Sequence, residues 1–147
     1  MSALDDKSWR ILTALQEDAR APLKALAEAA GLSVPATAER IRKMEEAGII
    51  RGYHADIDPE ALGYIIKAVV AITTQHPYKH KFIDVLRAMP QVLECLHVTG
   101  ADSCLFTVVA RNMADLEQIL ASLNKYGETR TSIVMSSQIR RRGVQRF

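Results

Sequence analysis

Apolar residues in the first fifty positions recur at helical spacing. Ile11, Leu12 and Leu15 lie on one face of a predicted first helix, and Asp5 is placed to cap the free amide groups at its start. Pro22 suits the first turn of a second helix, because its missing N–H would have no partner there. The buried stripe of this second helix consists of Leu23, Leu26, Ala27 and Ala30. The pattern therefore predicts two short amphipathic helices before residue 31.

A tight turn connects the second helix to a third. Gly31 is placed to end the second helix in the left-handed conformation, and Ser33 is a natural N-cap two residues later. Pro35 falls in the first turn of the third helix, which ends at Gly48. The predicted buried face of this helix consists of Thr37, Ile41 and Met44. Two helices joined by so short a turn are typical of a helix-turn-helix, which lays its second helix in the major groove of DNA.

The opposite side of the third helix carries small residues near its start and basic residues further along. At about 100° per residue, Pro35 and Ala36 point away from the buried face, where small side chains allow close approach to base edges. The basic groups are placed to neutralise phosphates, and neighbouring glutamates partly offset them. The predicted DNA-contacting residues are Ser33, Pro35, Ala36, Glu39, Arg40, Arg42, Lys43 and Arg51. Periodicity alone leaves a solvated helix face as an equal alternative.

The spacing of apolar residues changes after residue 48. The segment 49–53 has the pattern of a short strand, and the turn formers after it mark a connection between domains. An apolar, β-branched run at 65–74 predicts a strand, and residues 78–89 return to helical spacing between two prolines. The predicted division of the chain is a head at 1–48, a linker at 49–63 and a second domain at 64–147.

The second domain continues with two strands, a helix and a last strand. Apolar runs at 92–98 and 104–110 flank a turn-rich stretch suited to a hairpin. A helix capped by Asn112 follows, and residues 129–139 have the pattern of a final strand. The order βαββαβ is that of the ferredoxin-like fold, a four-stranded antiparallel sheet with both helices on one face. The predicted fold class is therefore α+β, with an N-terminal helix-turn-helix and a C-terminal ferredoxin-like domain.

A sheet with both helices on one face leaves its other face uncovered. In the strand at 65–74 both alternating sets of side chains are apolar, so the uncovered face would expose a sizeable patch. The two sets are Ile66, Ala68, Val70 and Ile72, and Ile65, Val69 and Ala71. A second copy of the chain is the simplest partner to cover this apolar face. A two-fold pair of heads also reads two half-sites on a duplex, so dimerisation and DNA binding support each other.

Composition adds limits to this picture. The 147 residues are 48% hydrophobic and 24% charged, as in ordinary globular proteins. The net charge of +2 is too small to indicate nucleic-acid binding by itself. Arginines cluster at 140–146, where a solvated tail is the simpler interpretation, and contact with DNA or with an acidic surface of a neighbouring subunit is the alternative. The chain lacks an apolar run of roughly 20 residues and a secretory signal, so a cytoplasmic protein without membrane association is expected.

Other groups of residues indicate neither a metal site nor catalysis. His76 and His80 have the spacing of a helical metal-binding pair, but a proline lies between them and no third ligand is nearby. His97 lies beside Cys95 on a predicted strand, without a third group to orient it as a catalytic base. The sequence therefore predicts no cofactor, no metal and no enzymatic activity.

Short motifs spread over the chain carry a family resemblance. They are Leu4-Asp5 with Ile11-Leu12, Asp18-Ala19-Arg20, Leu26-Ala27, Gly31-Leu32-Ser33, Arg40-Ile41 with Met44-Glu45, Gly48-Ile49-Ile50, Gly52-Tyr53 and Leu62-Gly63. Through them the whole chain resembles the Lrp/AsnC family, the feast/famine transcription factors of bacteria and archaea. The resemblance implies a winged-type head that binds double-stranded DNA, a ferredoxin-like effector domain, homodimers that often associate into octamers, and control by amino acids or related metabolites.

The resemblance also implies an effector site. In this family the hairpin loop between the second and third strands helps to bind the effector between dimers, and it matches residues 99–104 here. The effector residues carried over from the loop are Gly100, Ala101, Asp102 and Ser103. The loop departs from a common family form, in which glycine is followed by aspartate, tyrosine, aspartate and tyrosine. The identity of the effector therefore does not follow from the resemblance.

The loop chemistry suits a free amino acid. Asp102 is placed to accept hydrogen bonds from an ammonium group, and backbone amides near Gly100 are placed to donate to a carboxylate. Hydroxyl groups of the last strand extend this predicted site, and they belong to Thr129, Thr131 and Ser132. The alternative is that Asp102 only stabilises the hairpin turn.

Three functions remain at this point. The leading interpretation is a sequence-specific transcription regulator whose DNA binding or assembly responds to a small effector. An architectural DNA-binding protein with little sequence preference is the first alternative. A small metabolic enzyme on the second domain is the other, and it leaves the helix-turn-helix without a purpose.

Overall fold

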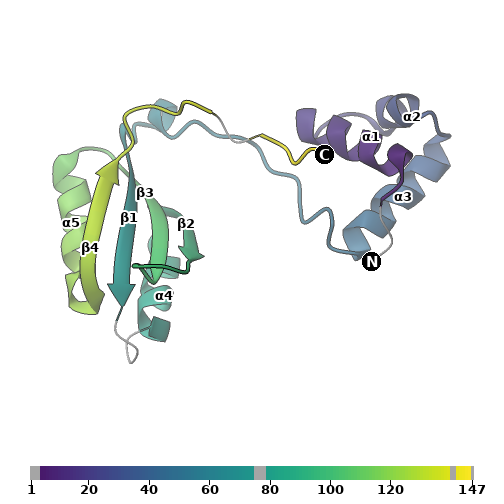
Figure 1. Cartoon of the computed structure of the whole chain (residues 1–147). Helices are drawn as coiled ribbons and strands as arrows, with labels where there is room; N and C mark the ends of the chain where they lie inside the picture. Colours follow the sequence, from purple (N-terminus) through teal and green to yellow (C-terminus); the bar gives the residue numbers. More distant parts are fainter. Residues whose placement is uncertain (1–3, 75–78, 140–141, 147) are drawn as a thin grey trace. The chain divides into compact units, whose positions relative to one another are not determined.

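A computed structural model describes residues 4–74, 79–139 and 142–146. The contacts divide the chain into two compact units, a head (Met1–Asp56 with Ile139–Phe147) and a sheet domain (Ile57–Gln138). Figure 1 shows the elements of each unit. His76, Arg140 and Arg141 lie outside the described residues. No helix in the described part of the chain has the length and apolar character that a membrane crossing requires.

Three helices form the head, as the spacing predicts. They are α1 (Asp6–Glu17), α2 (Leu23–Ala30) and α3 (Val34–Glu46). Gly31 ends α2 with φ of 63° and ψ of 47°, the left-handed conformation that glycine adopts most readily, and Ser33 caps α3. Pro22 lies at the cap of α2, one position before the predicted first turn. The centre of the head core is formed by Ile11, Ala30 and Met44.

The segment 49–53, predicted as a short strand, forms no strand in this structure. Its first amides are used to close α3, because the N–H groups of Ile49 and Ile50 both donate to the Met44 carbonyl, at 2.9 and 3.1 Å. Ile50 packs against the head core. The linker continues to a short 3-10 helix, η1 (Glu60–Leu62), before the sheet begins.

The sheet domain has the predicted βαββαβ order. Its elements are β1 (Ile66–Thr74), α4 (Lys79–Ala88), β2 (Val92–His97), β3 (Cys104–Ala110), α5 (Met113–Leu123), the 3-10 helix η3 (Asn124–Tyr126) and β4 (Gly127–Ile133). The strands are antiparallel in the order β2-β3-β1-β4, so β1 lies in the middle of the sheet (Figure 1). This is the ferredoxin-like arrangement that the order of elements predicts.

The last strand differs from its predicted range of 129–139. β4 begins at Gly127 and ends at Ile133, and the Val134 amide then donates to the Lys67 carbonyl at 2.8 Å. In this register Met135 lies opposite Ile66, the first residue of β1, so the chain beyond residue 135 has no neighbouring strand to pair with. Met135 and Ile139 are exposed outside the sheet.

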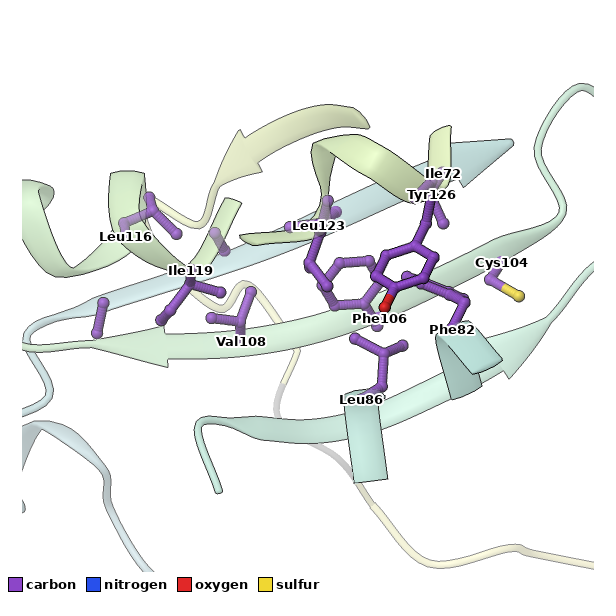
Figure 2. Packing of buried hydrophobic residues seen from close by; sticks show 13 residues of the cluster. Ile72, Phe82, Leu86, Cys104, Phe106, Val108, Leu116, Ile119, Leu123 and Tyr126 are labelled. Atoms are coloured by element: carbon purple, nitrogen blue, oxygen red, sulfur yellow. The ribbon is translucent and has the colours of Figure 1, made fainter. Parts of the chain in front are cut away.

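One face of the sheet forms the main core together with both helices. Phe82 from α4 lies between Phe106 of β3 and Tyr126, with ring centroids 6.2 and 5.8 Å away (Figure 2). Such edge and tilted contacts are favoured between aromatic rings. The remaining buried members include Ala68, Val70, Ile72, Leu86, Val108, Leu116, Ile119 and Leu123. The core therefore holds α4 and α5 on the same face of the sheet.

The other face of the sheet carries apolar side chains without a cover within the described sheet domain. Val69 and Ala71 of β1 lie on it, opposite Thr107 and Leu105 of β3, and Leu96 of β2 pairs with Leu105. Val69 is 37% exposed and Leu96 is 49% exposed. We call these five residues the open face. Their exposure agrees with the predicted uncovered patch.

Asp5 joins two helices of the head. Its carboxylate accepts from the Ser8 amide at 2.9 Å, which caps α1, and from the Arg40 guanidinium at 2.7 and 2.8 Å. The same Arg40 nitrogen donates to the Ser8 hydroxyl at 2.9 Å. Hydrogen bonds from Ser8, and then the Arg40 guanidinium, lower the pKa of Asp5 from 3.8 to about 2.

Asp5 gives the head an acid-dependent stability. Because its folded-state pKa is depressed, its contribution is present above pH about 4 and is lost as pH falls toward about 2. We expect Asp5→Asn, which keeps a capping oxygen, to lower the melting temperature at pH 6 and to approach wild type at pH about 2. Fluorescence of Trp9, the single tryptophan, reports unfolding of the head. A constant difference across this pH range would contradict the assignment.

Candidate DNA interface and effector site

The outward face of α3 begins with small, exposed side chains. Val34 is 41% exposed, and Pro35 and Ala38 are exposed beside it. Ala36, predicted to point outward, is half-buried, because its position on the helix turns it toward the flank of the buried face. Ala38 was missed by the sequence analysis, although its i, i+4 relation to Val34 marks the same side of the helix. The small surface at the start of α3 is therefore centred on Pro35 and Ala38.

Basic residues on α3 are partly held by glutamates of the same helix. Arg42 donates to Glu39 at 2.6 and 2.9 Å and also pairs with Glu46. These two carboxylates raise the pKa of Arg42. The Lys43 Nζ atom lies 3.6 Å from Oε1 of Glu39, and the Lys43 side chain is 67% exposed. Lys43 is therefore a more accessible cation than Arg42.

The two remaining predicted phosphate ligands differ in their surroundings. Arg40 is committed to Asp5 and Ser8 inside the head, and its side chain is 33% exposed. Arg51 is exposed just after α3 and makes no ion pair with the described residues. The structure therefore gives Arg40 a role in holding α3 against α1, whereas Arg51 is available to an anionic partner.

The segment 142–146, interpreted from sequence as a solvated tail, packs on α1. The Val144 amide donates to the Gln16 side-chain oxygen at 2.7 Å, and the Gln16 amide donates to the Val144 carbonyl at 3.0 Å. Arg146 pairs with Asp6 at the start of the same helix. A side chain at Gly143 would bring a Cβ within 2.6 Å of Gln16. The segment therefore packs with the head in this structure.

The loop between β2 and β3 is tied to the end of β1. The Ser103 amide donates to the Ile72 carbonyl at 3.0 Å, and the Thr73 hydroxyl donates to the Ala101 carbonyl at 3.1 Å. His97 contacts the Ser103 carbonyl through Nδ1 at 2.8 Å. These contacts fix the loop backbone against the sheet. Thr73 and His97 were not among the predicted residues of the effector site.

Asp102 forms an ion pair with Arg130 of β4. The Asp102 side chain is only 20% exposed, whereas that of Arg130 is 65% exposed. Arg130 was missed by the sequence analysis, although an arginine two positions before Ser132 lies on the same face of a strand. The loop therefore presents one carboxylate and one guanidinium side by side.

The predicted hydroxyl residues of β4 lie on two different faces. Thr129 pairs with Ile72 and Thr131 pairs with Val70, so both belong to the face that carries the helices. Ser132 pairs with Val69 on the open face, as Arg130 does with Ala71. Of the three hydroxyl residues, only Ser132 shares the face of Arg130, because successive side chains of a strand alternate.

The described residues contain no cluster of metal-binding side chains. No group of three histidine, cysteine or carboxylate side chains in that part of the chain is arranged to hold a metal ion. Cys95 and Cys104 are free thiols, and burial together with the neighbouring Cys104 raises the pKa of Cys95 to about 11. A thiol with so high a pKa is a poor nucleophile at neutral pH.

Known proteins resemble this chain over nearly its whole length. The AsnC-type helix-turn-helix domain matches residues 4–45, and the Lrp/AsnC ligand binding domain matches residues 67–144. The HTH-type transcriptional regulator AldR of Mycolicibacterium smegmatis is 37% identical over 138 residues, which cover 89% of this chain and 81% of AldR.

Solved structures of regulators agree with this match. A feast or famine regulatory protein from M. tuberculosis, complexed with L-methionine, superposes with a TM-score of 0.89 at 34% identity, over 97% of this chain and 99% of that one. A transcriptional regulator from Neisseria meningitidis, also in complex with L-methionine, gives a TM-score of 0.87 at 26% identity, over 95% and 94%. The chain belongs to the Lrp/AsnC family of helix-turn-helix transcriptional regulators, which bind DNA and are not enzymes.

Proposed function

We propose that the regulator reads DNA with the outward face of α3. Pro35 and Ala38 approach base edges at the start of the helix, while Lys43 and Arg51 contact phosphates. The observation that carries this proposal is the exposed, small-residue start of α3, next to accessible cations and away from the head core. Ser33, at the start of the helix, also lies on the exposed surface.

Arg42 joins the interface after a change of partner. In the free head it is neutralised by Glu39 and Glu46, which also repel phosphates. These pairs are exposed to solvent, so each contributes little and gives way to a phosphate at small cost. The two glutamates therefore weaken the binding of DNA of any sequence. Base contacts then account for a larger share of the binding free energy.

The open face of the sheet is proposed as the surface that joins two chains. Val69, Ala71, Leu96 and Leu105 form an apolar area on a sheet whose opposite face already carries both helices. A second copy buries this area symmetrically and supplies the second head that a palindromic site requires.

A free amino acid is the proposed effector, bound at the loop between β2 and β3. Asp102 pairs with the ligand ammonium, and Arg130 pairs with the ligand carboxylate. Binding therefore replaces the Asp102–Arg130 ion pair by two ion pairs with the ligand. Backbone amides near Gly100 add donors. Relatives of similar fold bind L-methionine, which supports this ligand class.

Lys43→Gln tests the DNA face. Loss of one phosphate contact should reduce the slope of log K against log salt by about 0.9, for every duplex tested. We expect no change for Lys81→Gln, an exposed lysine of α4. The measurement is fluorescence anisotropy on a duplex selected in vitro with the wild-type protein. An unchanged slope for Lys43→Gln would remove Lys43 from the interface, and failure to select any preferred duplex would favour architectural binding.

Val69→Asp tests the open face. A carboxylate buried among the apolar side chains of an interface loses its hydration, so we expect the variant to shift from dimer to monomer in light scattering at micromolar concentration. Ala121→Asp on α5 is the matched control, because this exposed residue lies on the helix side of the domain. Equal masses for wild type and Val69→Asp would place the interface elsewhere.

Asp102→Asn and Arg130→Gln test the effector loop. Each removes one of the two charges that a zwitterion needs, so we expect the thermal shift caused by free amino acids to fall by most of its wild-type size. The variant Asp84→Asn on α4 should respond as wild type does. If the thermal shift with every amino acid survives in both loop variants, the effector binds outside this loop.

A further inference from the structure

Two stretches of chain connect the head to the sheet domain, and they leave the sheet domain at neighbouring points. The first leads into β1, and the second follows β4. The Val134 amide, just after β4, donates to the Lys67 carbonyl at the start of β1 at 2.8 Å. The two connections therefore share one region of attachment on the sheet domain.

The same two connections are attached to different helices of the head. The first is held at the end of α3, where the Ile49 and Ile50 amides donate to the Met44 carbonyl. The second is held on α1 through residues 142–146, which we call the C-terminal clasp. A body held at one point rotates about that point, whereas a second attachment on another helix restricts this rotation. The clasp is therefore placed to limit the orientations that the head adopts.

The contacts of the clasp fix its backbone at one position on α1. Gln16 uses both polar atoms of its side chain on the backbone of Val144, as acceptor at 2.7 Å and as donor at 3.0 Å. A Cβ at Gly143 would lie 2.6 Å from the amide carbon and oxygen of Gln16 and 2.9 Å from its Cβ, so a larger residue displaces Gln16. The ion pair of Arg146 with Asp6 is exposed and contributes little. Gln16 and Gly143 are therefore the main determinants of the attachment.

We propose that the C-terminal clasp positions the head for DNA binding, and that Gln16 and Gly143 are positioning residues that act without touching the duplex. This role rests on the proposed function, because it requires two heads of a dimer on one duplex. Once the first head has bound, the second binds at an effective concentration, which rises when the head is held near the required orientation. The clasp therefore strengthens binding to two half-sites and leaves binding to one half-site unchanged.

The alternative is that the clasp only stabilises the fold of the head. Gln16 and Gly143 are exposed, and Val144 is 69% exposed. The buried centre of the head core, formed by three residues of α1, α2 and α3, includes no residue of the clasp. Loss of such surface contacts leaves the core intact, so we expect clasp variants to keep the melting temperature of wild type within a few degrees.

Fluorescence anisotropy with two duplexes tests the proposal on the full chain. One is the duplex selected in vitro with the wild-type protein, and the other is the same duplex with one half-site scrambled. We expect Gln16→Ala and Gly143→Ala each to weaken binding to the intact duplex by on the order of tenfold, and to the scrambled duplex by less than about twofold. Thr13→Ala, an exposed residue of the same helix, is the matched control. Lys43→Gln should instead weaken binding to both duplexes, because it removes a phosphate contact.

The double variant tests whether the two residues act through one contact. Gly143→Ala acts by displacing Gln16, so in the Gln16→Ala background it should weaken binding little further. Two independent losses that add would contradict this contact.

Trp9 on α1, the single tryptophan, gives a measurement without DNA. Its time-resolved fluorescence anisotropy reports how freely the head rotates. We expect the nanosecond component to have a larger amplitude in Gln16→Ala than in wild type or Thr13→Ala. Equal amplitudes in all three would overturn the restraint.

The outcomes separate this role from the proposed function. Equal binding of wild type to the intact and the scrambled duplex overturns the paired heads, and the role of the clasp with them. If wild type prefers the intact duplex and the clasp variants keep the same preference, only the role of the clasp is overturned. Equal loss on both duplexes, together with a lower melting temperature, gives the clasp a purely structural role and overturns the proposal as well.

Discussion

Strand β1 lies between β3 and β4. Its register with both neighbours decides which side chains of the sheet face the helices and which lie on the open face. Val70 pairs with Phe106 and Thr131, which sends all three to the face that carries the helices. A shift of one residue would exchange the core face and the open face along the whole strand. The core, the position of Arg130 beside Asp102 and the apolar open face all depend on this one alignment.

The helices and most strands were predictable because their signals are local. Asp5, Ser33 and Asn112 are caps in the structure, and Gly31 adopts the left-handed conformation that its position indicates. β3 agrees with its predicted range to the residue. In each case the apolar period and a capping or turn residue point to the same boundary, so the sequence leaves little choice.

The failures have a different cause, because they depend on the partners that each segment finds in the fold. The segment 49–53 has a strand pattern but donates its first amides to Met44 of α3, and β4 ends opposite Ala68, close to the first residue of β1. Thr129 and Thr131 carry suitable hydroxyls, yet only the register reveals that they face away from Arg130. Most of the fold could thus be predicted, whereas the composition of the candidate sites required the pairing of strands.

The chain passes between its two units twice, once near residue 56 and again near residue 139. A single proteolytic nick in the linker would therefore leave the head attached to the remainder through noncovalent contacts, which include those of Val144 and Arg146 with α1. The nicked protein would contain two polypeptides but behave as one particle for as long as that attachment lasts. The rate at which the fragments separate would then measure how firmly residues 142–146 hold the DNA-binding unit.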